Sequence, residues 1–245
     1  MKIAGYQGTT LIDWPGKIAS IIFVPGCNFR CPFCHNADLV DPQKIKKQSP
    51  LSEKEIWADL AKRRQWIDGV AMTGGEPTLQ PDLPAFLDKL KKLGFATMIE
   101  TNGTAPEVLN KLLAQKPRLL DYLSLDFKAP LDKTYAKTVG LKSFDPEIWL
   151  KSLKIILKAG LPFELRTTVV PTIHDEKALL RMARQILRLT SHGSRITSLI
   201  WFLQTFQPKN CLDPQFNKLK PYSRMEMESF LRVVKKIIPG VELRS

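Results

Sequence analysis

The chain has 245 residues, 44% of them hydrophobic, so it can bury a sizeable core as one large α/β domain or as two small ones. No stretch approaches the roughly 20 apolar residues of a membrane-spanning helix, and residues 1–15 lack the basic start and apolar run of a secretory signal, which predicts a soluble cytoplasmic protein with no membrane partner. The net charge of +13 favours an acidic partner, but no nucleic-acid-binding motif accompanies the charge, so we expect no nucleic-acid partner.

Strands and helices are predicted to alternate along the chain. Short runs of β-branched and aromatic residues predict strands at 18–24, 69–73, 95–101, 122–127, 162–169 and 198–205. The amphipathic segments between and after them predict helices at 52–67, 83–93, 106–115, 146–159, 176–190 and 223–237. Ser52 with Glu55 three residues later forms a capping box, which supports the first of these helices.

This alternation predicts an α/β fold with a parallel sheet. Six strand-then-helix units with right-handed crossovers would curl into a partial, TIM-like (β/α)6 barrel, because the eight units of a full barrel are not found. No Ser/Gly-rich linker interrupts the pattern. We therefore expect a single domain over 1–245, with an N-terminal extension at 1–17, a barrel core at 18–205 and a C-terminal helix and tail at 206–245.

Unusual motifs follow four of the predicted strands. They are residues 27–34, 74–77, 101–103 and 126–128. Parallel barrels carry their chemistry on the loops after the C-terminal ends of strands. The sequence therefore predicts a functional site on one rim of the barrel.

Three cysteines lie within eight residues, at Cys27, Cys31 and Cys34, and Cys211 is remote. Clustered thiols in a reducing cytosol bind metal or do redox chemistry more often than they form disulfides. Structural zinc normally needs four protein ligands, and His35 could complete a Cys3His set. A four-iron cluster held by three cysteines would instead leave one iron without a protein ligand. The spacing alone leaves both alternatives open.

Residues 27–36, with the sequence CNFRCPFCHN, resemble the signature of radical S-adenosylmethionine enzymes. Residues 7–17, QGTTLIDWPGK, look closest to the activating proteins of anaerobic ribonucleoside-triphosphate reductase, which are glycyl-radical-enzyme activases. The resemblance covers residues 3 to about 210 and is strong over the first 130. It implies that Cys27, Cys31 and Cys34 hold a [4Fe-4S] cluster whose open iron binds S-adenosylmethionine, which is then cleaved reductively.

The same resemblance assigns residues to the cofactors and implies no catalytic side chain beyond the cluster. The residues assigned to S-adenosylmethionine are Phe33, Gly74, Gly75, Glu76, Asp126 and Lys128. The glycine turn would receive the methionine amino group, because glycine lets a backbone approach a ligand closely. Asp126 and Lys128 share one face of their strand, where they would otherwise form a buried ion pair. Phe33 could pack near the adenine or fill the core of its own loop.

Further polar residues receive weaker interpretations. A monovalent cation near Glu100 and Asp126 is left open. Arg166 could be an interior partner for a carboxylate or could lie at the surface. His174 and His192 are expected to be exposed in loops. Cys211 is expected to be a small buried hydrophobe rather than a ligand.

The predicted function is activation of a glycyl radical enzyme, with anaerobic ribonucleoside-triphosphate reductase as the expected partner and a low-potential donor such as flavodoxin or ferredoxin as the source of electrons. One alternative is an activase of pyruvate formate-lyase, although residues 204–207 lack the His found in that subgroup. Others are a radical enzyme acting on a small molecule, as in deazapurine synthesis, and a zinc-stabilised nucleic-acid-binding protein.

Overall fold

The computed structural model describes residues 1–190 and 199–244, apart from the side chain of residue 190. The described strands follow chain order in an eight-stranded sheet. They are β1 (Gly5–Thr10), β2 (Ala19–Val24), β3 (Gly69–Gly74), β4 (Ala96–Thr101), β5 (Tyr122–Asp126), β6 (Phe163–Val169), β7 (Ile200–Thr205) and β8 (Val241–Arg244).

Helices lie between the strands and after the sheet's seventh strand. They are α1 (Ala37–Val40), α2 (Pro42–Lys47), α3 (Glu53–Arg63), α4 (Leu83–Lys92), α5 (Pro106–Ala114), α6 (Thr134–Thr138), α7 (Pro146–Ala159), α8 (Glu176–Thr190) and α9 (Arg224–Lys235), with short 3-10 turns at Pro77–Leu79 and Pro214–Lys218. In the part of the chain that is described, no helix has the length and apolar character needed to cross a membrane.

The predicted α/β fold class is confirmed. Strands β2 to β7 match the six predicted strands, except that residue 198 lies outside the described residues, and α3, α4, α5, α7, α8 and α9 match the six predicted helices. Strand β2 pairs with β3 in parallel, as do β3 with β4, β6 with β7 and β7 with β8. The sheet is larger than predicted, because β1 pairs antiparallel with β2 and β8 extends the other end.

The chain divides into two compact units. Unit 1 comprises Met1–Asn28, Asn36–Ser124 and Glu147–Pro162, and unit 2 comprises Phe29–His35, Leu125–Pro146 and Phe163–Ser245. The single domain expected from the sequence stays a prediction.

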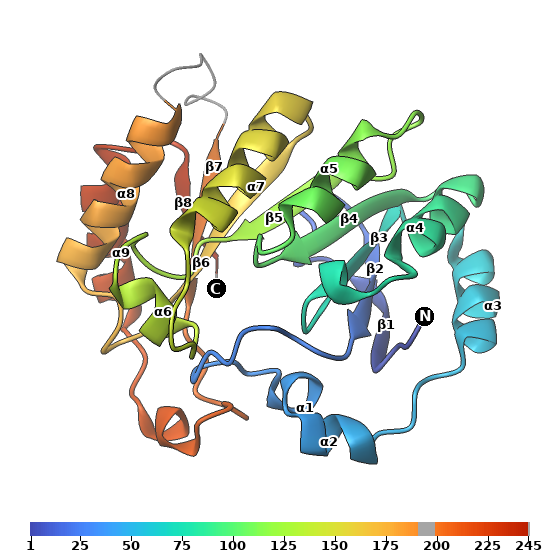
Figure 1. The fold of residues 1–245 in the computed structure, drawn as a ribbon, viewed down its shortest axis with the longest axis horizontal. Helices are drawn as coiled ribbons and strands as arrows, with labels where there is room; N and C mark the ends of the chain where they lie inside the picture. Colours follow the sequence, from blue (N-terminus) through green and yellow to red (C-terminus); the bar gives the residue numbers. More distant parts are fainter. Residues whose placement is uncertain (191–198, 245) are drawn as a thin grey trace. The chain divides into compact units, whose positions relative to one another are not determined.

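In unit 1, one face of the sheet carries small and medium apolar side chains in register. Ile21 pairs with Ala71, which pairs with Met98, and all three are buried together with Trp14. Trp14 comes from the segment between β1 and β2, and its ring lies 6.0 Å from that of Tyr122. Figure 1 shows α3 and α4 beside the strands of this unit. This packing fixes the strands whose C-terminal ends carry the polar motifs.

In unit 2, the β6–β7–β8 sheet has an equally apolar row, in which Leu165 pairs with Trp201 and Trp201 with Val241, all fully buried. Helices α8 and α9 contact each other, and α9 lies against β8 (Figure 1). The indole N–H of Trp201 donates to Thr167 Oγ1 at 2.9 Å, so this buried polar group is satisfied.

Candidate functional site

In unit 1, the first site segment is the glycine turn at the end of β3. Gly75 N donates to Val24 O at 2.8 Å and Glu76 N donates to Gly26 O at 2.7 Å, so the turn runs against the chain that leads into Cys27. A Cβ added at Gly75 would lie 1.9 Å from Gly26 O, and Gly74 has a φ of +115°. Only glycine allows this approach.

Glu76 joins this turn to the loop after β4. Its carboxylate is buried and accepts from Thr78 N (3.1 Å), Thr78 Oγ1 (2.6 Å), Thr101 Oγ1 (2.7 Å) and Asn102 N (2.7 Å). Burial raises the pKa of Glu76, and the hydrogen bonds donated by Asn102 and the two threonines oppose that shift. The carboxylate therefore holds two strand-end loops together, and its contact with a cofactor stays a prediction.

The loop after β4 also reaches the first cysteine. Asn102 Nδ2 lies 3.9 Å from Cys27 Sγ and donates to Asn28 Oδ1 at 2.8 Å. Thr104 N and Oγ1 both donate to Asn102 Oδ1, at 3.0 and 2.7 Å, which fixes the orientation of the amide. Asn102 thus presents an N–H group to the sulfur of Cys27, a contact that the sequence did not single out.

Glu100, on β4, accepts from Thr73 Oγ1 at 2.7 Å. This hydroxyl comes from the neighbouring strand β3. The bond gives Glu100 a structural partner within unit 1, and a cation beside it stays a prediction.

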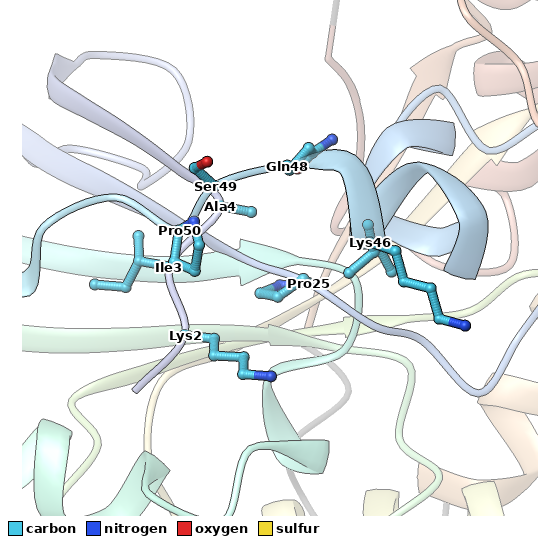
Figure 2. Close-up of a pocket in the computed structure, with 9 residues that line it drawn as sticks. Lys2, Ile3, Ala4, Pro25, Lys46, Gln48, Ser49 and Pro50 are labelled. Atoms are coloured by element: carbon cyan, nitrogen blue, oxygen red, sulfur yellow. The ribbon is translucent and has the colours of Figure 1, made fainter.

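Unit 1 also contains a pocket of about 270 Å³. Its apolar walls include Ile3 and Pro25, and Figure 2 shows Lys2 and Lys46 on two sides of Pro25. Pro25 directly follows β2 and is separated from Cys27 by one residue. None of the described residues that line the pocket is acidic.

In unit 2, the loop of Cys31 and Cys34 is anchored by backbone hydrogen bonds. Cys34 N donates to Cys31 O at 3.0 Å, which forms a tight turn. Leu212 N donates to Cys34 O at 3.0 Å, and Asp213 N donates to Pro32 O at 2.9 Å. The turn is thereby held by a segment far along the chain.

The residues that flank these cysteines differ in burial. Phe33 is 5% exposed, and its ring lies 6.5 Å from that of Phe216. Its packing against adenine stays a prediction. His35, the residue that could complete a zinc site, is exposed. Cys211 is buried, as expected of a small hydrophobe, and burial raises the pKa of its thiol.

Asp126 and Lys128 form an ion pair with Nζ 2.8 Å from Oδ2, and their side chains are about a quarter and a fifth exposed. Burial lowers the pKa of Lys128, but the charges of Asp126, Cys31 and Cys34 raise it by more, so the net pKa is above its ordinary value. Lys128 thus stays a cation among the two cysteines and the aspartate.

The backbone at the end of β5 is held by unit 2 side chains. Thr167 Oγ1 donates to Phe127 O at 2.6 Å, and His174 Nε2 lies 2.9 Å from Lys128 O. Val170 N donates to His174 Nδ1 at 3.0 Å, so the Nε2 atom carries the proton and donates to Lys128 O. These bonds fix the position of the chain on which Asp126 and Lys128 lie.

The expected exposure of His174 was wrong, because its side chain is fully buried. Burial lowers the pKa of His174 to about 4. Burial of the ring leaves no polar atom unsatisfied, because Nδ1 accepts from Val170 N and Nε2 donates to Lys128 O. His192 lies outside the described residues.

Tyr135, on α6, is fully buried, and its ring contacts those of Phe29 and Phe144, at centroid distances of 6.4 and 4.7 Å. Its hydroxyl has no hydrogen-bond partner among the described residues. Burial raises the pKa of Tyr135, the charges of Cys31 and Asp126 raise it further, and the charge and the backbone of Lys128 lower it. A protonated hydroxyl therefore lies in the surroundings of these groups.

Arg166 is buried and not at the surface. Its guanidinium lies 2.8 Å from Glu164 Oε1, and Arg244 on β8 binds the same carboxylate at 2.9 and 3.1 Å. The guanidinium of Arg244 also lies 3.7 Å from the ring centroid of Phe202. Glu164 therefore joins the last strand of the sheet to β6.

Several predicted site residues are thus brought together within each unit. Unit 1 places Cys27 beside the turn of Gly74, Gly75 and Glu76, and unit 2 places Cys31 and Cys34 in the field of Lys128. The described residues contain no assembled group of three or more His, Cys, Asp or Glu side chains suited to a metal ion. The three-cysteine ligand set therefore stays a prediction.

Comparisons with known proteins show which family the chain resembles. The model of the Radical SAM superfamily matches residues 21–183. A candidate glycyl-radical enzyme activating enzyme of Methanocaldococcus jannaschii is 32% identical, and the match covers 99% of this chain and 95% of that protein. A pyruvate formate-lyase-activating enzyme of Clostridium pasteurianum is 29% identical over 76% of each.

Among solved structures, Streptococcus suis SuiB bound to its precursor peptide SuiA matches with a TM-score of 0.66 and 14% sequence identity. The match covers 92% of this chain and 48% of SuiB, so the chain spans about half the length of that protein. This likeness concerns the fold alone, and it agrees with the α/β class seen in both units.

Proposed function

We propose that this chain, which belongs to the radical SAM superfamily, is an activase: it cleaves S-adenosylmethionine reductively and removes a hydrogen atom from a glycine of a partner enzyme, anaerobic ribonucleoside-triphosphate reductase. The cofactors of the family are a [4Fe-4S] cluster and S-adenosylmethionine. The observation that carries the proposal is the CxxxCxxC spacing of Cys27, Cys31 and Cys34 in a family member.

The residues present fit these cofactors. Three thiols are the donors that iron–sulfur clusters take, and a set of three leaves one iron open for a ligand. The turn at Gly75 has no side chain, so its backbone can approach a bound molecule. In unit 2, Tyr135 keeps a buried hydroxyl without a partner among the described residues, in the surroundings of Cys31 and Lys128. Such an atom is costly unless a ligand meets it.

Each group has a distinct task in the proposed reaction. Cys27, Cys31 and Cys34 hold the cluster, and the Gly74–Gly75 turn binds the methionine amino group. Lys128 stays protonated and meets the carboxylate of S-adenosylmethionine, while Asp126 balances the charge of Lys128 in the absence of that ligand. When bound, the cluster supplies the electron that breaks a carbon–sulfur bond of S-adenosylmethionine, which enables the adenosyl group to take a hydrogen atom from glycine.

The choice of an activase over other family activities is supported by the likeness to the Methanocaldococcus jannaschii protein, which extends over nearly all of both chains. The choice of the reductase as partner is supported by residues 7–17, whose sequence resembles the activating proteins of that enzyme. A pyruvate formate-lyase is the competing partner, in view of the Clostridium pasteurianum relative.

The test is transfer of the radical to a partner. The protein would be reconstituted anaerobically with iron and sulfide and mixed with dithionite, S-adenosylmethionine and either an anaerobic ribonucleoside-triphosphate reductase or a pyruvate formate-lyase. We expect the electron-spin signal of a glycyl radical with the reductase and none when Cys31→Ser replaces the wild type.

The possible outcomes separate the levels of the proposal. A signal with pyruvate formate-lyase alone would reject the reductase as partner but keep the activase. Cleavage of S-adenosylmethionine without a glycyl signal on either enzyme would reject the activase function. Protein that binds no iron and sulfide would reject the whole proposal.

A further inference from the structure

We propose that the Tyr135 hydroxyl donates a hydrogen bond to sulfur of the cluster at Cys31 and so makes the cluster easier to reduce. This inference rests on the proposed function and adds a residue to it. It starts from a buried hydroxyl that lacks a hydrogen-bond partner among the described residues. Native proteins rarely bury such a group, because it loses its bonds to water and gains nothing in return.

The ring of Tyr135 is held in place. It stacks on Phe144 at 4.7 Å with an interplanar angle of 20°, and it meets Phe29 edge to face at 6.4 Å. Phe29 stands two residues before Cys31 on the same loop, which is itself tied to α6's far end by the bond from Arg30 N to Val139 O (2.8 Å). The ring on α6 is therefore held against the loop that carries Cys31.

The surroundings of the hydroxyl favour sulfur as its acceptor. Lys128, Cys31 and Asp126 are the groups whose charges act on it, and Lys128 and Asp126 are already paired with each other at 2.8 Å. Because burial keeps the phenol protonated, Tyr135 can donate a hydrogen bond. A thiolate or sulfide of the cluster gains negative charge on reduction, so a donor stabilises the reduced form more and raises the reduction potential.

The experiment compares reduction potentials, which requires no turnover. Wild type, Tyr135→Phe and Tyr6→Phe would be reconstituted and titrated anaerobically without S-adenosylmethionine, with the reduced cluster followed by electron-spin resonance. We expect the equilibrium constant for one-electron reduction of the cluster to be about tenfold smaller in Tyr135→Phe. This corresponds to a reduction potential that is about 59 mV lower. Tyr6→Phe also loses a hydroxyl, one that donates to Asp59 at 2.7 Å in unit 1, and should keep the wild-type potential.

A potential for Tyr135→Phe within error of the wild type would overturn the inference, as would an equal shift in Tyr6→Phe. Denaturation of the cluster-free proteins gives a second readout. Tyr135→Phe should be at least as stable as the wild type, since it removes an unsatisfied group, and a clear loss of stability would show that the hydroxyl has a protein partner. Failure of the wild type to assemble a cluster would count against the proposed function instead.

The pocket in unit 1 carries an independent inference: it anchors an acidic side chain of the low-potential protein that donates electrons. Lys2 and Lys46 are exposed and form no ion pair with any described residue, while no described lining residue is acidic. The pocket of about 270 Å³ is smaller than the roughly 300–1,000 Å³ of typical small-molecule sites. It suits a single side chain better than a metabolite.

The position of the pocket favours an electron donor over other acidic proteins. Its wall residue Pro25 is followed by Gly26 and then by Cys27, so a protein anchored there lies beside the first predicted ligand of the cluster. The donor would lose one electron for each S-adenosylmethionine cleaved, which balances the reduction of one carbon–sulfur bond. A flavin or iron–sulfur protein with an acidic surface has this chemistry.

The test compares two reductants. Cleavage of S-adenosylmethionine would be measured with a reduced bacterial flavodoxin and, separately, with dithionite. We expect Lys2→Glu/Lys46→Glu to lower the flavodoxin-driven rate about tenfold or more at low salt and to leave the dithionite-driven rate unchanged. Lys151→Glu/Lys154→Glu, on exposed positions of α7, makes the same change in net charge and should retain the wild-type rate with both. Ser49→Trp, which fills the pocket without changing the charge, should likewise lower the flavodoxin-driven rate and leave the dithionite-driven rate unchanged.

Equal effects of the two double variants would overturn the inference, because net charge alone would then explain the loss. A wild-type flavodoxin rate in Ser49→Trp would overturn the anchoring role of the pocket. Absence of cleavage with dithionite in the wild type would instead reject the proposed function.

Discussion

The buried imidazole of His174 predicts a loss of stability in mildly acidic solution. Its pKa is lowered from 6.5 to about 4 by burial, so the folded protein holds the ring neutral where the unfolded chain protonates it. The neutral ring makes its full contribution to the free energy of unfolding above pH 6.5, the pKa in the unfolded chain. That contribution falls as the pH drops from 6.5 towards 4, the pKa in the folded protein, and it does not change further below pH 4. The difference of about 2.5 between the two pKa values corresponds to about 3 kcal/mol of the free energy of unfolding, at 1.36 kcal/mol for each pH unit.

The structure gives the reason for this cost. His174 Nδ1 accepts from Val170 N at 3.0 Å and Nε2 donates to Lys128 O at 2.9 Å, so both nitrogens are used by the neutral ring. Protonation of Nδ1 would place two N–H groups against each other. The buried ring would also carry a charge without solvation.

The assay is urea denaturation of the cluster-free protein, kept reduced, at several pH values between 7.5 and 4.5. The comparison variants are His174→Asn, whose amide oxygen can replace Nδ1, and His174→Gln, whose amide nitrogen can replace Nε2. Glu76 titrates in the opposite sense, because its raised pKa adds stability as the pH falls. The wild-type minus variant difference removes that contribution and should shrink by about 2.5 kcal/mol between pH 7.5 and 4.5, because the window ends just above the folded pKa of about 4.

Parallel curves for the wild type and both variants would refute the reasoning, since the titrating group would then lie elsewhere. The two variants also separate the two hydrogen bonds. If the bond to Lys128 O positions the lysine, His174→Gln should bind S-adenosylmethionine more tightly than His174→Asn in the reconstituted protein. The reverse order would limit His174 to stabilising its own turn.

Three substitutions at the strand ends test other parts of the site. Glu76→Gln should cost about 1–3 kcal/mol in urea denaturation, because an amide NH2 cannot accept from a backbone N–H and one such donor is left unsatisfied; an unchanged midpoint would contradict this. Gly75→Ala should cost about 3 kcal/mol and lower the iron content after reconstitution, because its Cβ meets Gly26 O; full iron content would show that the turn can move. Lys128→Met should weaken S-adenosylmethionine binding by about 2 kcal/mol or more in equilibrium dialysis, and unchanged affinity would exclude a contact with the carboxylate.

The strands that were predicted are those with strong local signals. Residues 19–24 and 69–74 are nearly continuous apolar runs, typical of strands buried on both faces. Strand β1, GYQGTT, was missed because it is half polar and contains two glycines, and it gains its hydrogen bonds only by pairing with β2. Strand β8 has four residues, too short for a pattern to be recognised.

Site residues that belong to a short sequence motif could be predicted. Residues whose role depends on a contact with a residue far away in the chain could not. The cysteines and the Gly74–Gly75 turn are recognisable in one line of sequence. His174 lies among polar neighbours, TIHDE, which suggest a surface loop, and only its acceptor 46 residues earlier makes it a buried residue. The same holds for Tyr135, whose unsatisfied hydroxyl is visible only once the packing around it is known.

The backbone bonds from residues 212 and 213 to the loop of Cys31 and Cys34 have a consequence for biosynthesis. During translation the cysteines leave the ribosome roughly 180 residues before the segment that clamps their loop. At about 5–20 residues per second, the nascent chain would present open thiols for about ten seconds or longer. Iron can therefore be delivered to a completed loop only after residues 212 and 213 have been synthesised.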